Sequence, residues 1–346
     1  DGKAQLLIVN LQNGALIKAI DTGVGDGNGL GGVHLVRNSA NQVIGAYAGD
    51  LKGNLWKFHL NDTDPDNWTV SKEGGASKPL FVAKDAAGTP QPITAAPLAI
   101  PHPDGGMVVV AGTGRFFDAP DVNTTAGQTI YGIRDEKAFA ANAVAPVSGT
   151  GELVMQTLIE KTLDAKDRTR VITSFDDTTS TQTITYYEVS INPIDWKVKK
   201  GWYFHQPFSG QRMVYPVSTV TGRLAKVDTI VPAGVSTDPC ASATPGKGYN
   251  YIIDALSGGS PQGPFLDTNG DGVVNSNDVS ASGYSTGLDG RDVVLPTGGT
   301  SSTTVGDPPC VVIVDSSGGS TRACTRPLTT APTFKRKSSW QQLFIR

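Results

Sequence analysis

Oxygen-bearing side chains recur at alternating positions in one short stretch of the chain, residues 267–278. The donors are, in order, Asp267, Asn269, Asp271, the backbone carbonyl of Val273, Asn275 and Asp278. Gly272 follows the third donor and allows the sharp turn by which the backbone can wrap around a single centre. A set of carboxylates, amides and a carbonyl suits a hard cation with about six to eight oxygen ligands, so the stretch predicts a Ca²⁺ site.

The spacing is that of an EF-hand loop, but two features differ from calcium-sensor proteins. The twelfth position holds Asp278 instead of glutamate, so bidentate closure by this side chain needs a closer backbone. Residues 258–264, just before the loop, are rich in glycine and proline and cannot form the first of two flanking helices. We therefore expect a local staple or a switch for neighbouring loops; a polar Asn/Asp/Gly turn without a cation is the alternative.

The elements that position this loop are expected to be β-strands. Glycine (41) and proline (22) together approach a fifth of the 346 residues, which favours short strands joined by turns over long helices. Hydrophobic residues make up 38% of the chain, enough to build a core. The net charge of −3 gives no support to a nucleic-acid partner, and no apolar run approaches the roughly 18 residues of a transmembrane helix. Because the chain opens at Asp1 in what reads as mid-domain sequence, we expect a mature or excised fragment.

Strand-like segments come in four groups of about four strands, each group roughly 50 residues long. The groups span residues 5–60, 80–134, 153–206 and 212–255. Within the first group, residues 43–58 read as two strands joined by a tight Asp-x-x-Gly turn. A weak internal repeat of apolar strand, polar turn and glycine relates residues 8–14 to residues 252–258 and, in part, to residues 55–60. The chain is therefore predicted to be a single all-β domain, residues 1–346, with the fold of a quinoprotein-like, modified β-propeller.

Four blades are few for a closed propeller, so we expect the C-terminal blades of a larger propeller, or a set that another segment closes. The tail, residues 338–346, is a candidate closing strand. Residues 257–311 are rich in Gly, Ser, Thr and Asp and are predicted to form a long loop insertion at a blade rim, which carries the calcium site 267–278. Cation binding there would offset the entropy of ordering a glycine-rich loop.

The three cysteines, Cys240, Cys310 and Cys324, form no CxxC pair and so give no zinc pattern. Cys310 and Cys324 flank a predicted hairpin that would bring them opposite each other, which favours a disulfide between them. Cys240 would then be free or bonded to a segment outside the chain; three buried thiols are the alternative. An oxidising, calcium-rich exterior would suit both the loop and the disulfide.

Two short motifs of enzyme chemistry occur without the structural context that they need. Residues 283–287 match G-x-S-x-G, but Leu288, Asp289 and Gly290 follow where a nucleophile elbow requires a helix. Residues 27–32 match G-x-G-x-x-G, but the next residues read as a strand where a dinucleotide site requires a helix N-terminus. No residue is therefore assigned a catalytic role, and the chain is predicted not to be an enzyme.

Five segments follow one another in an order typical of one bacterial family. They are residues 47–58 (YAGDLKGNLWKF), 112–117 (GTGRFF), 128–135 (QTIYGIRD), 200–203 (KGWY) and 337–340 (KSSW). Together they resemble the PilC/PilY family of type IV pilus tip-associated adhesins, and the resemblance spans nearly the whole chain and the C-terminal part of the family's propeller domain.

The resemblance implies a modified β-propeller with an EF-hand-like calcium loop, whose occupancy is linked to pilus extension and retraction, twitching motility, adhesion and virulence. It implies an exported protein at the pilus tip, on the outer-membrane-associated surface of a Gram-negative bacterium. Minor pilins would be its partners, and a host-cell or abiotic surface its target. The residues that match the family's short loop by position are Asp267, Asn269, Asp271, Val273 and Asn275. The family loop usually closes with Asp at its ninth position; here Asn275 holds that position and Asp278 follows, so a nine-residue and a twelve-residue closure both stay open.

Two other classes of protein remain as alternatives. A quinoprotein dehydrogenase also combines a propeller with calcium, but it gathers its ligands from separate blades and not from one contiguous loop. A dockerin-like assembly module uses similar loops, but it requires a duplicated loop and short helices, whereas the sequence contains one such loop.

Overall fold

The computed structural model describes residues 2–137, 139, 143–164, 169–173, 179–183, 185–232, 247–266, 268–269, 273–286, 310–314 and 320–324. Within them the regular structure consists of β-strands and three short 3-10 turns, η1 (Pro65–Asn67), η2 (Ala119–Asn123) and η3 (Thr150–Glu152). None of the described residues belongs to an α-helix, so the all-β prediction is confirmed for them. No helix in this part of the chain is long and apolar enough to cross a membrane.

Most strands belong to three large sheets, here named A, B and C. Sheet A has the order β3-β4-β5-β6, with β9 also paired to β5: β3 (Leu30–Arg37), β4 (Val43–Asp50), β5 (Asn54–His59), β6 (Thr69–Val70) and β9 (Phe81–Val82). Sheet B has the order β10-β11-β12-β18-β13: β10 (Leu98–Pro101), β11 (Met107–Gly112), β12 (Thr129–Asp135), β18 (Gly201–His205) and β13 (Val154–Met155). Sheet C has the order β14-β17-β23-β22-β21-β19, with β20 paired to β21: β14 (Leu158–Glu160), β17 (Thr185–Val189), β23 (Gly283–Thr286), β22 (Lys247–Asp254), β21 (Leu224–Val231), β19 (Arg212–Met213) and β20 (Ser218–Thr221).

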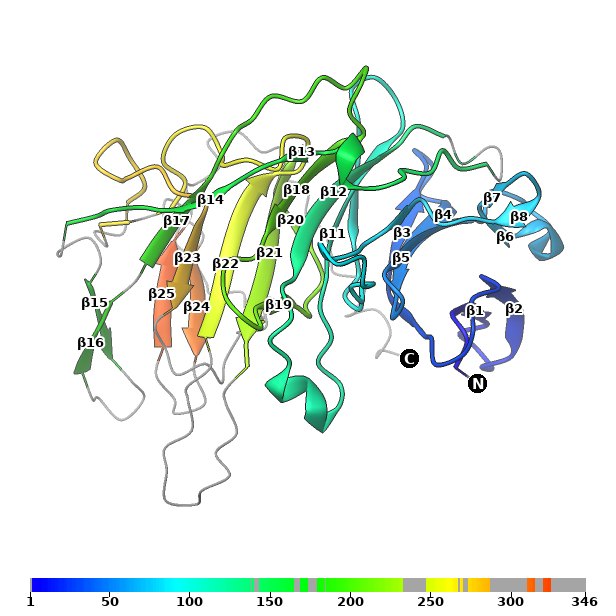
Figure 1. The fold of residues 1–346 in the computed structure, drawn as a ribbon, viewed down its shortest axis with the longest axis horizontal. Helices are drawn as coiled ribbons and strands as arrows, with labels where there is room; N and C mark the ends of the chain where they lie inside the picture. Colours follow the sequence, from blue (N-terminus) through cyan, green and yellow to red (C-terminus); the bar gives the residue numbers. More distant parts are fainter. Residues whose placement is uncertain are drawn as a thin grey trace.

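Four two-stranded sheets complete the described structure. They are β1 (Gln5–Val9) with β2 (Leu16–Asp21), β7 (Lys72–Glu73) with β8 (Ala76–Ser77), β15 (Thr169–Thr173) with β16 (Thr179–Thr183), and β24 (Cys310–Val314) with β25 (Ser320–Cys324). Sheets C, B and A follow one another in an arc that ends at the β1–β2 pair (Figure 1). This side-by-side arrangement is that of propeller blades.

The sheets differ from the predicted strand groups because pairing does not follow chain order. Residues 153–206 form no blade of their own, and that prediction was wrong: β13 and β18 complete sheet B, whereas β14 and β17 form one edge of sheet C. On its other side β17 pairs with β23, which lies within the predicted insertion 257–311. Local alternation of apolar residues predicts that a segment is a strand, but it does not specify the strand's partner.

The turn between β4 and β5 shows why the predicted Asp-x-x-Gly hairpin forms. Asp50 is buried, and one of its oxygens accepts the backbone N–H groups of Lys52 and Asn54 at 2.9 Å each. Its other oxygen accepts the indole N–H of Trp56 at 2.8 Å. Gly53 has a φ of +78°, and a Cβ there would lie 2.6 Å from a carbonyl oxygen, so the position requires glycine.

Apolar clusters fill the spaces between neighbouring sheets. Residues of sheets B and C form one cluster, centred on Trp202 and Tyr251, and residues of sheets A and B form another around Tyr47 and Tyr131. The indole of Trp202 is fully buried and crosses from sheet B to donate to the carbonyl of Ala255 (2.9 Å). Trp202 therefore serves in packing between the two sheets.

A buried ion pair also joins sheet A to sheet B. The ammonium of Lys57 on β5 lies 2.6 Å from the carboxylate of Asp135 at the end of β12, and both side chains are fully buried. The hydroxyl of Tyr47 donates to the same carboxylate oxygen (2.5 Å). Burial lowers the pKa of Lys57, and the nearby carboxylate acts in the opposite direction.

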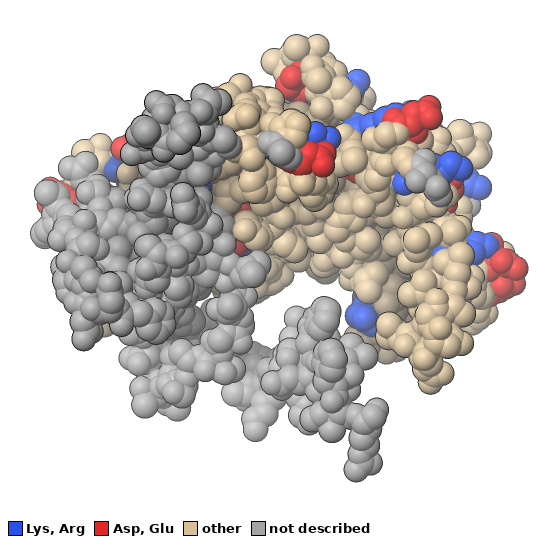
Figure 2. Space-filling model, turned by 90° about the horizontal axis from the view of Figure 1, so that it is seen from below, with Lys and Arg blue, Asp and Glu red and all other residues tan. Residues whose placement is uncertain are grey.

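The face of the molecule seen from below carries charged side chains of both signs, mostly toward its margin (Figure 2). The middle of its described surface is largely uncharged (Figure 2). The described part of this face shows no broad positive patch of the kind that binds nucleic acid (Figure 2).

Candidate metal centre

The loop predicted to bind calcium leaves β22 and leads into β23, and both of its ends are anchored on sheet C. Phe265 and Leu266 at its start and Ala281 at its end pack with Ile252 of β22 in one buried cluster. Ser282 is fully buried, and its N–H donates to a backbone carbonyl of β17 (2.8 Å). The span of the loop is thus fixed by a sheet and not by the loop alone.

Asp278 closes the loop through hydrogen bonds. Its side chain is buried, and one carboxylate oxygen accepts the N–H groups of Thr268 (2.8 Å) and Asn269 (3.3 Å). The other oxygen accepts the N–H of Asn275 (2.8 Å). The hydroxyl of Thr268 also accepts the N–H of Val279 (2.8 Å). The carboxylate therefore joins the second and third positions of the loop to the ninth.

The predicted ligands divide between described and undescribed positions. Asn269, Val273, Asn275 and Asp278 lie within the described residues, whereas Asp267 and Asp271 lie outside them. The side-chain oxygen of Asn275 accepts the N–H of Asn277 (2.7 Å). The side-chain oxygen of Asn275 and one oxygen of Asp278 each accept one of these hydrogen bonds and keep a lone pair for a cation. The other oxygen of Asp278 already accepts the N–H and hydroxyl of Thr268 and the N–H of Asn269. The described geometry is therefore compatible with the nine-residue closure and with a twelve-residue closure through one oxygen of Asp278. The all-oxygen donor set fits a calcium ion.

The predicted cysteine hairpin is present. Strands β24 and β25 pair antiparallel, and their register places the backbone of Cys310 directly opposite that of Cys324. The side chains of both residues, and the whole of Cys240, lie outside what the structure describes. The hairpin is therefore confirmed, and the disulfide stays a prediction.

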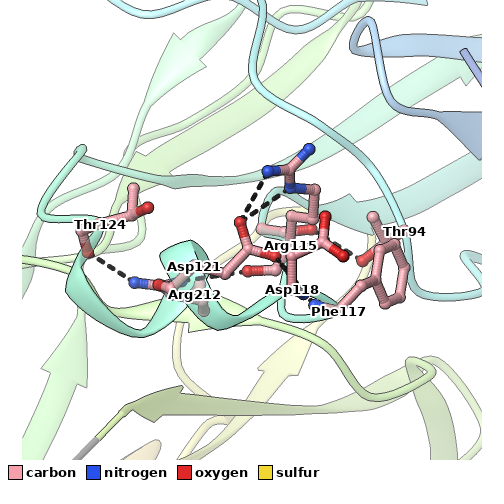
Figure 3. A network of polar contacts seen from close by, with 8 residues as sticks. Thr94, Arg115, Phe117, Asp118, Asp121, Thr124 and Arg212 are labelled. Carbon is pink, nitrogen blue, oxygen red and sulfur yellow. Dashed lines mark hydrogen bonds and ion pairs between the residues drawn. The ribbon is translucent and has the colours of Figure 1, made fainter. Parts of the chain in front are cut away.

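A polar network holds the loop between β11 and β12, which contains the Gly-Thr-Gly-Arg-Phe-Phe segment (Figure 3). The guanidinium of Arg115 lies 2.8 Å from one oxygen of Asp121, and the other oxygen accepts the N–H groups of Phe117 (2.9 Å) and Asp118 (3.0 Å). Burial acts to raise the pKa of Asp121, but these hydrogen bonds and the guanidinium outweigh it, so the pKa lies below its usual value.

Sheet C contributes a second arginine to this network. Arg212 at the start of β19 is 3% exposed, and it donates to the carbonyls of Arg115 (3.0 Å), Asp121 (2.6 Å) and Thr124 (2.6 Å) (Figure 3). Sequence reasoning used the Arg-Phe-Phe segment as a signature and did not find this role. The ion pair between Arg115 and Asp121 could have been proposed from the sequence, because the acidic residue lies six positions after the arginine. The sequence gives no indication of the contribution of Arg212, because this residue lies on a strand distant along the chain.

Comparisons with known proteins agree with this architecture. The family model of the PilY1 beta-propeller domain matches residues 1–173. The type IV pilus biogenesis factor PilY1 of Pseudomonas aeruginosa is 33% identical over 302 residues, which cover 79% of this chain and 24% of the relative. A PilY1 homolog of Xylella fastidiosa is 32% identical over 282 residues, which cover 76% of this chain and 17% of the relative. The crystal structure of the P. aeruginosa PilY1 C-terminal domain matches with a TM-score of 0.67 and 28% identity, covering 93% of this chain and 67% of that chain.

Fold and comparisons together define an all-β protein of the propeller class. The chain belongs to the PilY1 family, and it resembles that family's C-terminal part. It spans about a quarter of the length of the P. aeruginosa relative.

Proposed function

We propose that this chain is a calcium-binding part of a type IV pilus-associated protein, and that calcium occupancy of residues 267–278 regulates pilus extension and retraction. The hydrogen-bonded closure by Asp278 carries the proposal, because it holds positions 2, 3 and 9 of the loop together. The predicted donors of this loop are all oxygen atoms, as calcium requires. The relatives are named as pilus biogenesis factors and not as enzymes, which supports a regulatory or adhesive role without catalysis.

The wider role follows from the same family membership. The protein is proposed to act outside the cell at the pilus tip, with minor pilins as partners, and to contribute to twitching motility and to attachment to host-cell or abiotic surfaces. Calcium would order the loop and bias these contacts. Since the chain covers about a quarter of its relative, these activities belong to the proposal for the complete protein.

Calorimetric calcium titration of the chelator-stripped chain tests the site. One-site binding is expected, and Asp271→Ala is expected to abolish it while the β-sheet circular dichroism spectrum is retained. Glu73→Gln is the matched control, because it removes an exposed carboxylate that pairs with Lys78 (3.5 Å) far from the loop along the chain. Absence of binding to the unaltered chain, or equal binding by Asp271→Ala, would refute the assignment.

One further variant separates the two closures. Asn275→Asp is expected to raise calcium affinity about tenfold or more if the ninth position ligates the ion, because a carboxylate replaces an amide. An unchanged affinity would assign closure to the twelfth position. Twitching assays of strains with Asp271→Ala then test regulation, and normal motility would limit calcium to a structural role.

A further inference from the structure

A groove of about 590 Å³ opens beside the calcium loop. Its walls come from the segment before β18, the turn between β20 and β21, and the residues between β22 and the loop. Phe265, two residues before the first predicted ligand, is one of its lining residues and also belongs to the buried cluster that anchors the loop. The size is that of a site for a small ligand.

One end of the groove presents a fixed aromatic surface. The indole of Trp196 is half-buried and lines the groove. His102 packs against it edge-on, with ring centroids 4.6 Å apart, and the guanidinium of Arg134 lies 5.7 Å from the ring. An indole held by these neighbours is rigid, and the part of it that lines the groove offers apolar surface to a ring-shaped ligand.

A positioned arginine lies on the groove's polar side. Arg223 is 60% exposed, and its Nε lies 2.5 Å from an oxygen of Asp254, which is 10% exposed. The other oxygen of Asp254 accepts the N–H of Leu256 (2.9 Å), which fixes the carboxylate. Among the described residues no other side chain pairs with this guanidinium, so its terminal nitrogens can donate to a ligand carboxylate.

Amide side chains complete the polar lining. Asn192 donates its amide N–H to the carbonyl of Met155 (2.7 Å), which orients its oxygen as an acceptor. Gln262 is exposed at the groove. Amides offer both donors and acceptors, which is what hydroxyl groups require.

We propose that this groove binds an acidic saccharide, with a sugar ring against Trp196, its carboxylate on Arg223 and its hydroxyls on Asn192 and Gln262. The inference rests on the proposed function, because it names the ligand class of the attachment surface. Calcium in the neighbouring loop stabilises the wall that contains Phe265, so the saccharide binds more weakly to chelator-stripped protein.

The test is titration of the calcium-saturated chain with sialyllactose and with trigalacturonic acid, followed by tryptophan fluorescence and calorimetry. Lactose, which lacks the carboxylate, is the neutral probe. At least one acidic probe is expected to bind at least about tenfold more tightly than lactose, since a charge-assisted hydrogen bond contributes about that factor or more. Equal binding of all three probes, or no binding of any, would overturn the proposal.

Variants connect the binding to these side chains. Arg223→Gln is expected to weaken binding of the acidic probe about tenfold and to leave lactose unaffected, and Trp196→Phe to weaken both. Arg37→Gln, a change of an exposed arginine on β3, is the control and should bind as the unaltered chain does. Unchanged binding by Arg223→Gln would contradict the proposed contact. Calcium binding without saccharide binding would refute the groove alone, whereas saccharide binding without calcium binding would refute the metal centre alone.

Discussion

Lys57→Met is expected to lower the free energy of unfolding by about 3–5 kcal/mol. The side chains of Lys57 and Asp135 are fully buried, with the charged atoms 2.6 Å apart. Methionine retains an unbranched apolar stem but removes the ammonium, so the carboxylate stays buried. Among the described residues its remaining donors are the hydroxyl of Tyr47 (2.5 Å) and the N–H of Lys137 (3.0 Å). Removal of one partner of a buried ion pair costs this much because the other charge is left uncompensated.

A double-mutant cycle isolates the pair. Lys57→Met/Asp135→Asn removes both charges and is expected to cost less than the sum of the single changes, with a coupling of about 2 kcal/mol or more. Urea unfolding followed by tryptophan fluorescence measures these differences, since Trp56 precedes Lys57 on β5. The control Lys78→Met breaks an exposed pair and should stay within about 0.5 kcal/mol of the unaltered chain.

Two results would refute the reasoning about this pair. A loss below about 1 kcal/mol for Lys57→Met would mean that the carboxylate finds compensation in water or in a rearranged neighbour. Single changes that add without coupling would mean that the two groups do not stabilise each other.

Three more changes test other parts of the structure. Asp278→Ala is expected to speed hydrogen exchange of the Thr268 amide about 5- to 150-fold with or without calcium, because the buried acceptor of this N–H is removed. An effect confined to the calcium-loaded protein would make Asp278 a ligand only. Burial lowers the pKa of His59 to about 4, below its unfolded value of about 6.5, so up to about 3 kcal/mol of stability is present above pH 6.5 and lost as the pH falls toward 4. His59→Gln should flatten this part of the urea-midpoint profile, and an unchanged slope would contradict the assignment. Gly132→Ala places a Cβ 2.2 Å from the indole of Trp202 and should cost about 1–3 kcal/mol in urea unfolding; a neutral effect would show that the indole can move.

Local chemistry explains the parts of the fold that the sequence predicts well. The β4–β5 hairpin could be predicted from the sequence because Asp50 and Gly53 determine its turn within four residues. The β24–β25 hairpin could also be predicted, since the apolar run Cys310–Val314 is followed by a polar, glycine-containing turn sequence and a short return segment. The pairing of β17 with β23 could not be predicted from the sequence, because nothing in either segment distinguishes it from other half-buried strands as a partner of the other.

In the candidate metal centre, too, features set by neighbouring residues could be predicted from the sequence, and features set by the path of the folded chain could not. Calcium ligands in an EF-hand-like loop come from contiguous residues, so their spacing is visible in the sequence. The role of Asp278 as acceptor for the N–H of Thr268 and Asn275 depends on the path of the loop backbone, which a pattern of side chains does not specify. The groove beside the loop depends on Arg223 and Trp196, which come from separate segments and meet only in the folded chain.

The exchange of strands between sheets B and C has a consequence for folding kinetics. Strand β12 pairs with β18 only after the chain has made the excursion that contains β17, and β17 pairs in turn with β23, much later in the chain. Closing such long loops costs entropy before any pairing compensates it, and chains dominated by non-local pairs fold slowly. Until residues 283–286 have been synthesised, β17 can pair with β14 but not with β23, and it presents one unpaired edge that favours misassembly. Sheets B and C are therefore expected to form as one cooperative unit. A chain that stops after β18 contains every strand of sheet B, but it leaves β14 and β17 without the rest of sheet C and exposes the face of sheet B that packs against sheet C.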